Sequence, residues 1–226
     1  FLRSDMLAIT AVSRQFVKQP ADWPPNAHIS GFFYLPPSAA AIQREIPEGL
    51  EEWLAKGDTP VYLGFGSIPV PNQTRLYRAL EGLLEEKRVV FCANWSLVKG
   101  EPVHPNLFVT KYVDHGWLMP RCCAVVIHGG IGTIAAALRS GTPIIVGSVL
   151  ADQPVNGAMI GQKKLGSHIP FKRLSSARML QAVRSAHEPS IREHCKAMAA
   201  AMKAEDGLGR AVELLEKYLE ATPSFF

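Results

Sequence analysis

The sequence lacks both a long apolar run and an apolar leader. No segment reaches the ~18 consecutive apolar residues of a membrane-spanning helix, so no such helix is expected. No positively charged stretch stands before an apolar one near Phe1, so a signal peptide is not expected either. The chain begins Phe1-Leu2-Arg3 without methionine, and we expect it to come from the middle of a longer, cytoplasmic protein.

Metal-binding patterns are missing as well. The four cysteines, Cys92, Cys122, Cys123 and Cys195, lack metal-ligand spacing, and adjacent cysteines in a strand would point to opposite faces. The seven histidines are dispersed, and no Asp-x-Asp pair is present to hold a divalent cation on a nucleotide diphosphate. We therefore expect reduced cysteines, no metal and no other cofactor.

The charge of the chain does not indicate a large anionic partner. The formal net charge is +4, but the lysines and arginines are scattered and form no stripe interleaved with aromatic residues. Nucleic acid is therefore not an expected partner. A small anionic ligand suits the charge, although only weakly.

Short apolar runs alternate with amphipathic segments along the middle of the chain. The runs predict strands at residues 60–67, 88–95, 107–113, 123–128 and 142–149, with a short edge strand at 167–171. Helices are expected between them, for example from Leu76 to Lys87, where apolar residues recur at helical spacing. Strands that alternate with helices predict an α/β fold, a Rossmann-like parallel sheet with helices on both faces. With 226 residues, 47% of them hydrophobic, the chain can bury a full core.

The two ends of the chain differ from this middle part. Before Pro60, frequent prolines favour an extended linker, interrupted by one helix at residues 47–55. Past Ser175 the pattern is helical. It includes a capping box at residues 190–193 and a final helix that begins after Gly209.

One stretch carries most of the chemical information, Val126-Ile127-His128-Gly129-Gly130-Ile131-Gly132-Thr133. An apolar strand delivers a histidine to a glycine-rich turn, which opens directly into a helix. The glycines let the backbone approach a ligand closely, and the free N–H groups at the helix start attract an anion. With His128 as a donor or cation at its mouth, the turn predicts a diphosphate site. The alternative is a tight turn whose glycines only relieve crowding.

Two polar residues follow the next predicted strand. The apolar run from Pro143 to Leu150 is followed at its carboxyl end by Asp152 and Gln153. The carboxyl ends of neighbouring parallel strands face the same crevice, so these side chains are expected beside His128. A carboxylate and an amide in that place can bind the hydroxyls of a sugar. The alternative role for Asp152 is a helix N-cap.

Together these motifs resemble the donor site of GT-B glycosyltransferases of the sterol 3-beta-glucosyltransferase and macrolide glycosyltransferase kind. The likeness is to their carboxyl-terminal, donor-binding domain. It extends to Tyr112–Pro120, similar to the family's Val-Pro-His-x-x-Leu-Phe-Pro segment, and to the glycine-rich turn Gly64–Ser67. Ala21–Pro24 and Gly31-Phe32 are similar to the link between the two domains, so the likeness covers nearly the whole chain.

The resemblance implies a donor site for UDP-glucose. It assigns the phosphates to Ser67, His128, Gly132 and Thr133, with Gly130 and Ile131 in the same turn, the sugar hydroxyls to Asp152 and Gln153, and the base to the Val113 backbone. Trp95, at a strand end, is expected to stack on the ribose or base, with a core tryptophan as the alternative. No catalytic residue is assigned, because the family's general base lies in the amino-terminal acceptor domain. The isolated chain is therefore expected to bind the donor but barely turn over.

The resemblance also implies an organisation for the chain. Residues 1–59 are expected to form the interdomain linker and first helices, and residues 60–206 the nucleotide-sugar-binding domain. Residues 207–226 are expected to form a terminal helix that packs on the missing acceptor domain. The implied reaction is an inverting transfer of glucose from UDP-glucose to a lipophilic acceptor hydroxyl, such as that of a sterol. Any contact with a membrane surface is expected to be peripheral and made through the missing domain.

Two other functions stay open on the sequence. The same signature serves enzymes that transfer a dTDP-deoxysugar to a natural product. Alternatively, the chain is a non-catalytic nucleotide-sugar-binding or interaction module. It is then either a split subunit that needs a partner chain or a degenerate remnant whose site is closed by Ile127, Ile131 and Ile134. The family often has a histidine, a small residue and a threonine at those positions.

Overall fold

The computed structural model describes residues 6–34, 46–66, 69–93 and 104–221 of the chain. The chain divides into two compact units, one from residues 44–199 and the other from residues 1–43 and 200–226. The larger unit carries the predicted strands and the glycine-rich turn.

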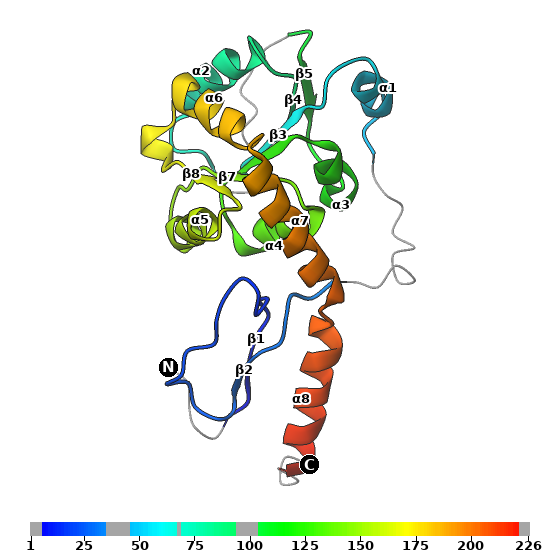
Figure 1. The fold of residues 1–226 in the computed structure, drawn as a ribbon, viewed down its shortest axis with the longest axis vertical. Helices are drawn as coiled ribbons and strands as arrows, with labels where there is room; N and C mark the ends of the chain where they lie inside the picture. The colour runs from blue at the N-terminus through cyan, green and yellow to red at the C-terminus, as the bar shows by residue number, and fades with distance from the viewer. Residues whose placement is uncertain (1–5, 35–45, 67–68, 94–103, 222–226) are drawn as a thin grey trace. The chain divides into compact units, whose positions relative to one another are not determined.

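The larger unit is built on a parallel six-stranded sheet (Figure 1). In spatial order its strands are β5 (Leu107–Thr110), β4 (Val89–Cys92), β3 (Val61–Gly64), β6 (Ala124–Ile127), β7 (Ile144–Val146) and β8 (Gly166–His168). The order runs outward from β3 in one direction and from β6 in the other, as in a doubly wound fold. Ligands of such folds bind at the carboxyl ends of the strands, where the order reverses. The predicted Rossmann-like parallel sheet is confirmed.

The central strands end in register. Gly64 of β3 pairs with Cys92 of β4 and with Ile127 of β6, and Ile127 pairs with Val146 of β7. The loops that follow these strands therefore leave from one edge of the sheet. The loops after β3 and β6 lie side by side at the reversal point.

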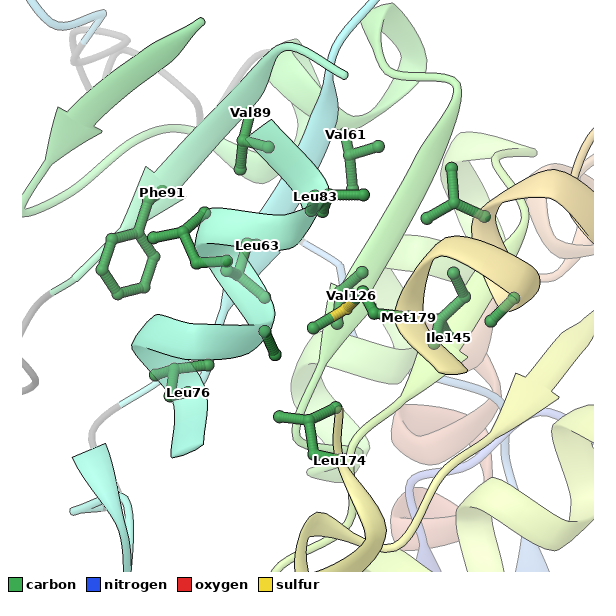
Figure 2. Close-up of a cluster of buried hydrophobic side chains, with 14 of the residues drawn as sticks. Val61, Leu63, Leu76, Leu83, Val89, Phe91, Val126, Ile145, Leu174 and Met179 are labelled. Carbon is green, nitrogen blue, oxygen red and sulfur yellow. The ribbon is translucent and has the colours of Figure 1, made fainter. Parts of the chain in front are cut away.

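One face of the sheet is covered by α2 (Gln73–Leu84) and α6 (Ser176–Ser185). Alternate strand residues, such as Val61 and Leu63, point to this face and pack against the leucines of α2 and Met179 of α6 (Figure 2). The helix α2 begins where Asn72 accepts a hydrogen bond from the Arg75 N–H at 2.8 Å, a side-chain N-cap. Burying each such apolar side chain is worth roughly 1.5–3 kcal/mol.

The opposite face of the sheet carries α4 (Ile131–Ser140) and α5 (Gln153–Gln162) (Figure 1). The short helices α3 (His115–Leu118) and η1 (Met119–Arg121) lie beside α4. Because α4 follows β6 and α5 follows β7, both helices begin at the carboxyl edge of the sheet. The remaining helices in chain order are α1 (Leu50–Ala55), η2 (Phe171–Arg173) and α7 (Pro189–Ala204).

The smaller unit contains a parallel pair of short strands and the last helix. β1 (Ala8–Thr10) pairs with β2 (Ala27–Ile29), and α8 spans Gly207–Ala221. One side of α8 is buried through Ala211 and Leu214. Apolar residues of α8 that are between 39% and 48% exposed recur at positions 208, 212, 215 and 219, which is helical spacing. This apolar stripe therefore lies along one side of α8.

Three local expectations differ from the structure. The capping box at residues 190–193 is wrong, because α7 begins at Pro189, whose missing N–H is tolerated in the first position of a helix. Gly209 lies in the first turn of α8 rather than before it, and its N–H is capped by Asp206 at 2.9 Å. The pair β1–β2 was not predicted, because the frequent prolines before Pro60 favoured an extended linker there.

The predicted functional boundaries, after residues 59 and 206, stay predictions, because compactness alone does not test them. Within the part of the chain that the structure describes, no helix is both long enough and apolar enough to cross a membrane.

Candidate functional site

The glycine-rich turn joins β6 to α4 at the reversal point of the sheet. Gly129 has φ +95°, and a Cβ atom there would lie 2.6 Å from Cγ1 of Val146, so only glycine fits. Gly130 stands at the N-cap of α4 and provides no side-chain cap. The N–H groups of the first helical turn, beginning at Ile131, have no partner within the helix and are available to a ligand.

The imidazole of His128 is enclosed by two glycine turns. A Cβ atom added at Gly66 would lie 2.9 Å from its Cε1, and one added at Gly130 would lie 2.4 Å from its Nε2. His128 is 7% exposed, and its buried Nδ1 has no hydrogen-bond partner among the described residues. Burial lowers the pKa of His128, an effect that the charge of Asp152 opposes, so the ring is neutral near physiological pH. A ligand oxygen would supply the partner that this nitrogen lacks.

The surroundings of Gly132 differ from those of the other glycines in the turn. A Cβ atom added at Gly132 would meet nothing within 4 Å. Ile131 and Gly132 are exposed, and Thr133 is half-buried. Because the fold itself does not require glycine at position 132, the open space beside it is a place where a ligand can approach the backbone.

Asp152 and Gln153 lie at the start of α5, on the same edge of the sheet. Asp152 occupies the N-cap position of α5, as the alternative interpretation has it, but its side chain accepts no capping hydrogen bond. Gln153 is 1% exposed, and its Oε1 accepts hydrogen bonds from the N–H groups of Val149 at 2.7 Å and Leu150 at 3.1 Å. Gln153 thus shapes the loop after β7, whereas the Asp152 side chain is exposed.

Asn156 connects these two parts of the site. Its side chain is buried, and Nδ2 donates to the Gly129 carbonyl at 2.9 Å and to Oδ2 of Asp152 at 2.8 Å. The sequence interpretation missed this residue. Its spacing of four residues from Asp152 at a helix start was the available signal, because residues i and i+4 of a helix share a face.

The segment that follows β5 supplies a third part of the same edge. Val113 is buried, and Asp114 caps α3 by accepting from the Trp117 N–H at 3.2 Å. Nε2 of the next residue, His115, lies 2.8 Å from the Tyr62 hydroxyl of β3. Burial lowers the pKa of His115; the charge of Asp114 opposes this effect, and His128 adds to it. No role was predicted for His115.

Two of the predicted ligand contacts cannot be placed. Ser67 and Trp95 lie outside the described residues, so their assignments to phosphate and to ribose or base stay predictions. Among the residues that the structure describes, no three His, Cys, Asp or Glu side chains are grouped closely enough to hold a metal ion.

The fold and the site define a class of protein. A doubly wound sheet whose reversal point holds a glycine-rich helix start is the arrangement of a nucleotide-binding α/β domain. Residues 87–216 match the family described as the erythromycin biosynthesis protein CIII-like, C-terminal domain. This match covers more than half of the chain, and the chain belongs to that family of glycosyltransferase domains.

Curated relatives support this assignment. A sterol 3-beta-glucosyltransferase of Arabidopsis thaliana is 35% identical over 212 residues, which cover 92% of this chain and 33% of the relative. An O-mycaminosyltylonolide 6-deoxyallosyltransferase of Streptomyces fradiae is 32% identical over 215 residues, which cover 92% of this chain and 49% of the relative. The chain thus spans about one third to one half of the length of these two proteins.

Solved structures share the fold. The glycosyltransferase of kitacinnamycin matches with a TM-score of 0.79 at 20% identity, over 94% of this chain and 55% of that chain. The calicheamicin glycosyltransferase matches with a TM-score of 0.74 at 21% identity, over 96% of this chain and 53% of that chain.

Proposed function

We propose that this chain is the donor-binding half of an enzyme that transfers glucose from UDP-glucose to a lipophilic acceptor hydroxyl, that of a sterol. One observation carries the proposal. The buried Nδ1 of His128, which has no hydrogen-bond partner among the described residues, stands beside a helix start whose first turn is open at Gly132. The sterol acceptor is supported by the 35% identity to a sterol 3-beta-glucosyltransferase.

We assign the diphosphate to His128 and to the N–H groups of Gly132 and Thr133, without a metal ion. A diphosphate brings about two negative charges, and charge-assisted hydrogen bonds are worth roughly 1.5–3 kcal/mol each. The start of α4 adds about 0.3–1 kcal/mol through its dipole. These contributions suffice to bind a nucleotide, and the absence of an Asp-x-Asp pair from the sequence motivates the metal-free assignment.

We assign the sugar hydroxyls to Asp152 and Gln153. The Asp152 carboxylate is exposed and held by Asn156, so it is oriented to accept hydrogen bonds from hydroxyl groups. Since Oε1 of Gln153 is engaged by the backbone, only its NH₂ group remains for the sugar. The Val113 backbone is assigned to the base, as the resemblance implies.

The proposed reaction is a displacement that inverts the anomeric carbon. The acceptor hydroxyl oxygen attacks this carbon, and the bond to the diphosphate oxygen breaks with its electron pair passing to the diphosphate. The hydroxyl proton passes to a general base in the amino-terminal domain. Negative charge therefore develops on the phosphates, where His128 and the first turn of α4 stabilise it.

The stripe on α8 supports a missing acceptor domain. The exposed apolar residues of α8 follow helical spacing, and an amphipathic face of this kind is normally covered by another apolar surface. We propose that the amino-terminal acceptor domain covers it. The association of that domain with a membrane surface belongs to the same proposal.

A dTDP-deoxysugar is the second candidate donor. The 32% identity to a 6-deoxyallosyltransferase favours it, because that relative is as fully matched along this chain as the sterol enzyme. The further alternative is a non-catalytic nucleotide-sugar-binding subunit, which would bind a donor but remain inactive with every acceptor domain.

Titration calorimetry tests donor binding. Half of a site should bind UDP with a Kd between about 1 mM and tens of micromolar, equally with and without EDTA. Loss of binding on chelation would contradict the metal-free assignment. His128→Ala should weaken UDP and UDP-glucose alike by roughly 1.5–3 kcal/mol, because both share the diphosphate. Tighter binding of dTDP-sugars than of UDP-glucose would favour the second candidate.

A transfer assay tests the division of labour between domains. The isolated chain should transfer no measurable radiolabelled glucose to a sterol panel, and adding the amino-terminal domain should restore transfer. General-base catalysis alone is worth about 10²–10⁴ in rate, so the deficit should exceed assay noise. Turnover by the isolated chain would show that a base lies within it. No turnover with the acceptor domain, despite UDP binding, would favour the non-catalytic subunit.

A further inference from the structure

Five cationic side chains lie on η2 and near the beginnings of α2 and α6, and the nearest acidic residue along α2 is Glu81, three residues after Arg78. These side chains, called the basic face below, are Arg75, Arg78, Lys172, Arg173 and Arg178. Residues 69–80 and 169–187 supply all of these side chains and contain no Asp or Glu. Within the described part of the chain, none of the five forms an ion pair. Arg184, further along α6, differs from them because it pairs with Glu86 at 2.6 Å.

A hollow of about 570 Å³ lies between the beginnings of α2 and α6, and two cations of the basic face, Arg75 and Arg78, line it. The hollow is lined by Asn72, Thr74, Arg75, Arg78, Leu174, Ser175 and Ser176. Thr74 and Ser175 carry hydroxyl groups that can donate hydrogen bonds to an anion, whereas the hydroxyl hydrogen of Ser176 is used within the protein. The hollow thus combines two fixed positive charges with neutral donors, whereas Lys172, Arg173 and Arg178 lie outside its lining.

The frame of the hollow is firmly held. Ser176 Oγ donates to the Arg78 carbonyl at 2.8 Å, and a Cβ atom at Gly82 would lie 2.3 Å from Cβ of Ser176, so α2 and α6 are in close contact. The guanidinium of Arg75 donates to the Phe171 and Lys172 carbonyls, which ties α2 to η2. The cations are therefore presented on a rigid scaffold.

The charges of this face repel one another, and no acidic neighbour within its segments offsets them. A bound anion would relieve that repulsion. Arginine predominates over lysine in the face, and its planar fork matches phosphate oxygens in a bidentate geometry. The hollow has no aromatic lining residue on which a base could stack, so single-stranded nucleic acid is a poor fit.

The basic face is distinct from the nucleotide-sugar site. α2 and α6 cover one face of the sheet, whereas α4 and α5, which carry the glycine turn and Asp152, lie on the other (Figure 1). Neither His128 nor Asp152 lines the hollow. Arg75 and Lys172 also line a second hollow with Val149 and Pro154, so the basic face approaches the loop that precedes α5.

We propose that the basic face is a second anion site, which binds a phosphate monoester group. The group belongs either to a lipid headgroup or to a free phosphate ester. On a lipid, it would hold the donor half against an anionic surface.

Vesicle flotation and calorimetry test this proposal on the full chain. The probes are phosphatidylcholine vesicles, alone or with one fifth phosphatidic acid or phosphatidylglycerol, and free glycerol 3-phosphate. The face variant combines Arg78→Gln, Lys172→Gln and Arg173→Gln, none of whose native side chains donates a hydrogen bond in the described chain. The control combines Arg192→Gln, Lys196→Gln and Lys203→Gln, which removes three exposed charges from α7. Thermal unfolding should be the same for both variants.

We expect binding to phosphatidic acid vesicles that the face variant weakens roughly 100-fold, since each cation near an anionic surface contributes about five-fold. The control should weaken it by less than about five-fold. If the face variant weakens glycerol 3-phosphate binding as much as vesicle binding, the phosphate group comes from a free ester. If the native chain binds the vesicles but not glycerol 3-phosphate, the phosphate group comes from the lipid headgroup.

Three results would overturn the proposal. They are no binding of either probe by the native chain, equal weakening by the two variants, and equal binding to phosphatidylglycerol vesicles. UDP binding is measured in parallel on every variant. Its absence would count against the proposed function without affecting the result for the basic face.

Discussion

The side-chain amide of Asn156 donates to the Asp152 carboxylate at 2.8 Å and, through the same nitrogen, to the Gly129 carbonyl at 2.9 Å. One buried residue therefore joins the sugar side of the candidate site to the phosphate turn. Its loss would free the Asp152 carboxylate to rotate and leave the Gly129 carbonyl without this donor. Removing a partner from a buried polar group costs about 1–3 kcal/mol.

Substitutions of this pair should separate the two ligands. Asp152→Ala should weaken UDP-glucose and leave UDP nearly unchanged, whereas Asn156→Ala should weaken both, because it also disturbs the glycine turn. In the double variant, the effects on UDP-glucose should be non-additive by about 0.5–3 kcal/mol, as for residues in direct contact. Equal effects of Asp152→Ala on UDP and UDP-glucose, by calorimetry, would remove Asp152 from the sugar site.

Gly132→Ala should separate folding from binding. The added methyl group meets no protein atom within 4 Å, and replacing a helical glycine by alanine stabilises by up to about 1 kcal/mol. The same methyl group would stand where the phosphates approach, so UDP binding should be lost. Gly161→Ala on α5 is the matched control, because that position is equally open. It should show the same thermal stability gain with unchanged UDP affinity. A Gly132→Ala protein that binds UDP normally would place the diphosphate elsewhere.

The pH dependence of stability should report the buried state of His128. Burial lowers the pKa of His128 in the folded chain below the ordinary ~6.5, which applies to the unfolded chain. At pH values between the folded and the unfolded pKa, the unfolded chain therefore binds more protons than the folded chain. The stabilisation from the neutral ring is therefore complete above ~6.5 and is lost as pH falls through the lowered pKa.

The melting temperature of the native chain should accordingly fall on mild acidification, and the melting temperature of the His128→Gln variant should fall less. Some dependence should remain from His115, whose pKa burial also lowers. Bound UDP should favour the protonated ring and raise the melting temperature more at mildly acidic than at neutral pH. Identical pH profiles for the native chain and His128→Gln would mean that His128 does not titrate as described.

The stripe on α8 should matter for assembly and not for folding. Val212 and Leu215 are 47% and 48% exposed, so the double change to glutamate should shift the melting temperature little. It should abolish binding of the separately produced amino-terminal domain, because two charges would be buried unpaired at the contact. Glu213→Lys, exposed on the same helix, is the control for altered charge. Undiminished binding by the double variant would show that the acceptor domain docks elsewhere.

Much of the fold followed from local patterns. The buried strands are nearly continuous apolar runs, such as Ala124–Ile127, and this is how strands of a doubly covered parallel sheet appear in a sequence. The strands proved shorter than predicted, because apolar residues such as Val149 continue past the last ladder pair into the loops at the carboxyl edge. The three-residue strands of the smaller unit were missed, because their pairing depends on contacts between distant segments.

The sequence by itself determined the position and chemistry of the glycine turn, because the φ of Gly129 and the open first turn of α4 follow from local backbone demands. It also placed Asp152 at the same edge, because strand order and direction constrain where a loop leaves the sheet. Only the tertiary structure decided that the Gln153 amide oxygen turns inward, that Asn156 joins Asp152 to Gly129, and that Nδ1 of His128 lacks a partner in the described part of the chain.

The basic face is the clearest case of a feature that the sequence did not reveal. Arg75 and Arg78 are separated from Lys172 and Arg173 by nearly a hundred residues, and along the chain these charges are part of an unremarkable scatter. They gather because the apolar sides of α2 and α6 must cover the same face of the sheet, which brings the beginnings of the two helices together. The local sequence pattern determines which side chains lie on each face of a helix or strand. Burial of the shared apolar core determines which helices and strands pack next to one another.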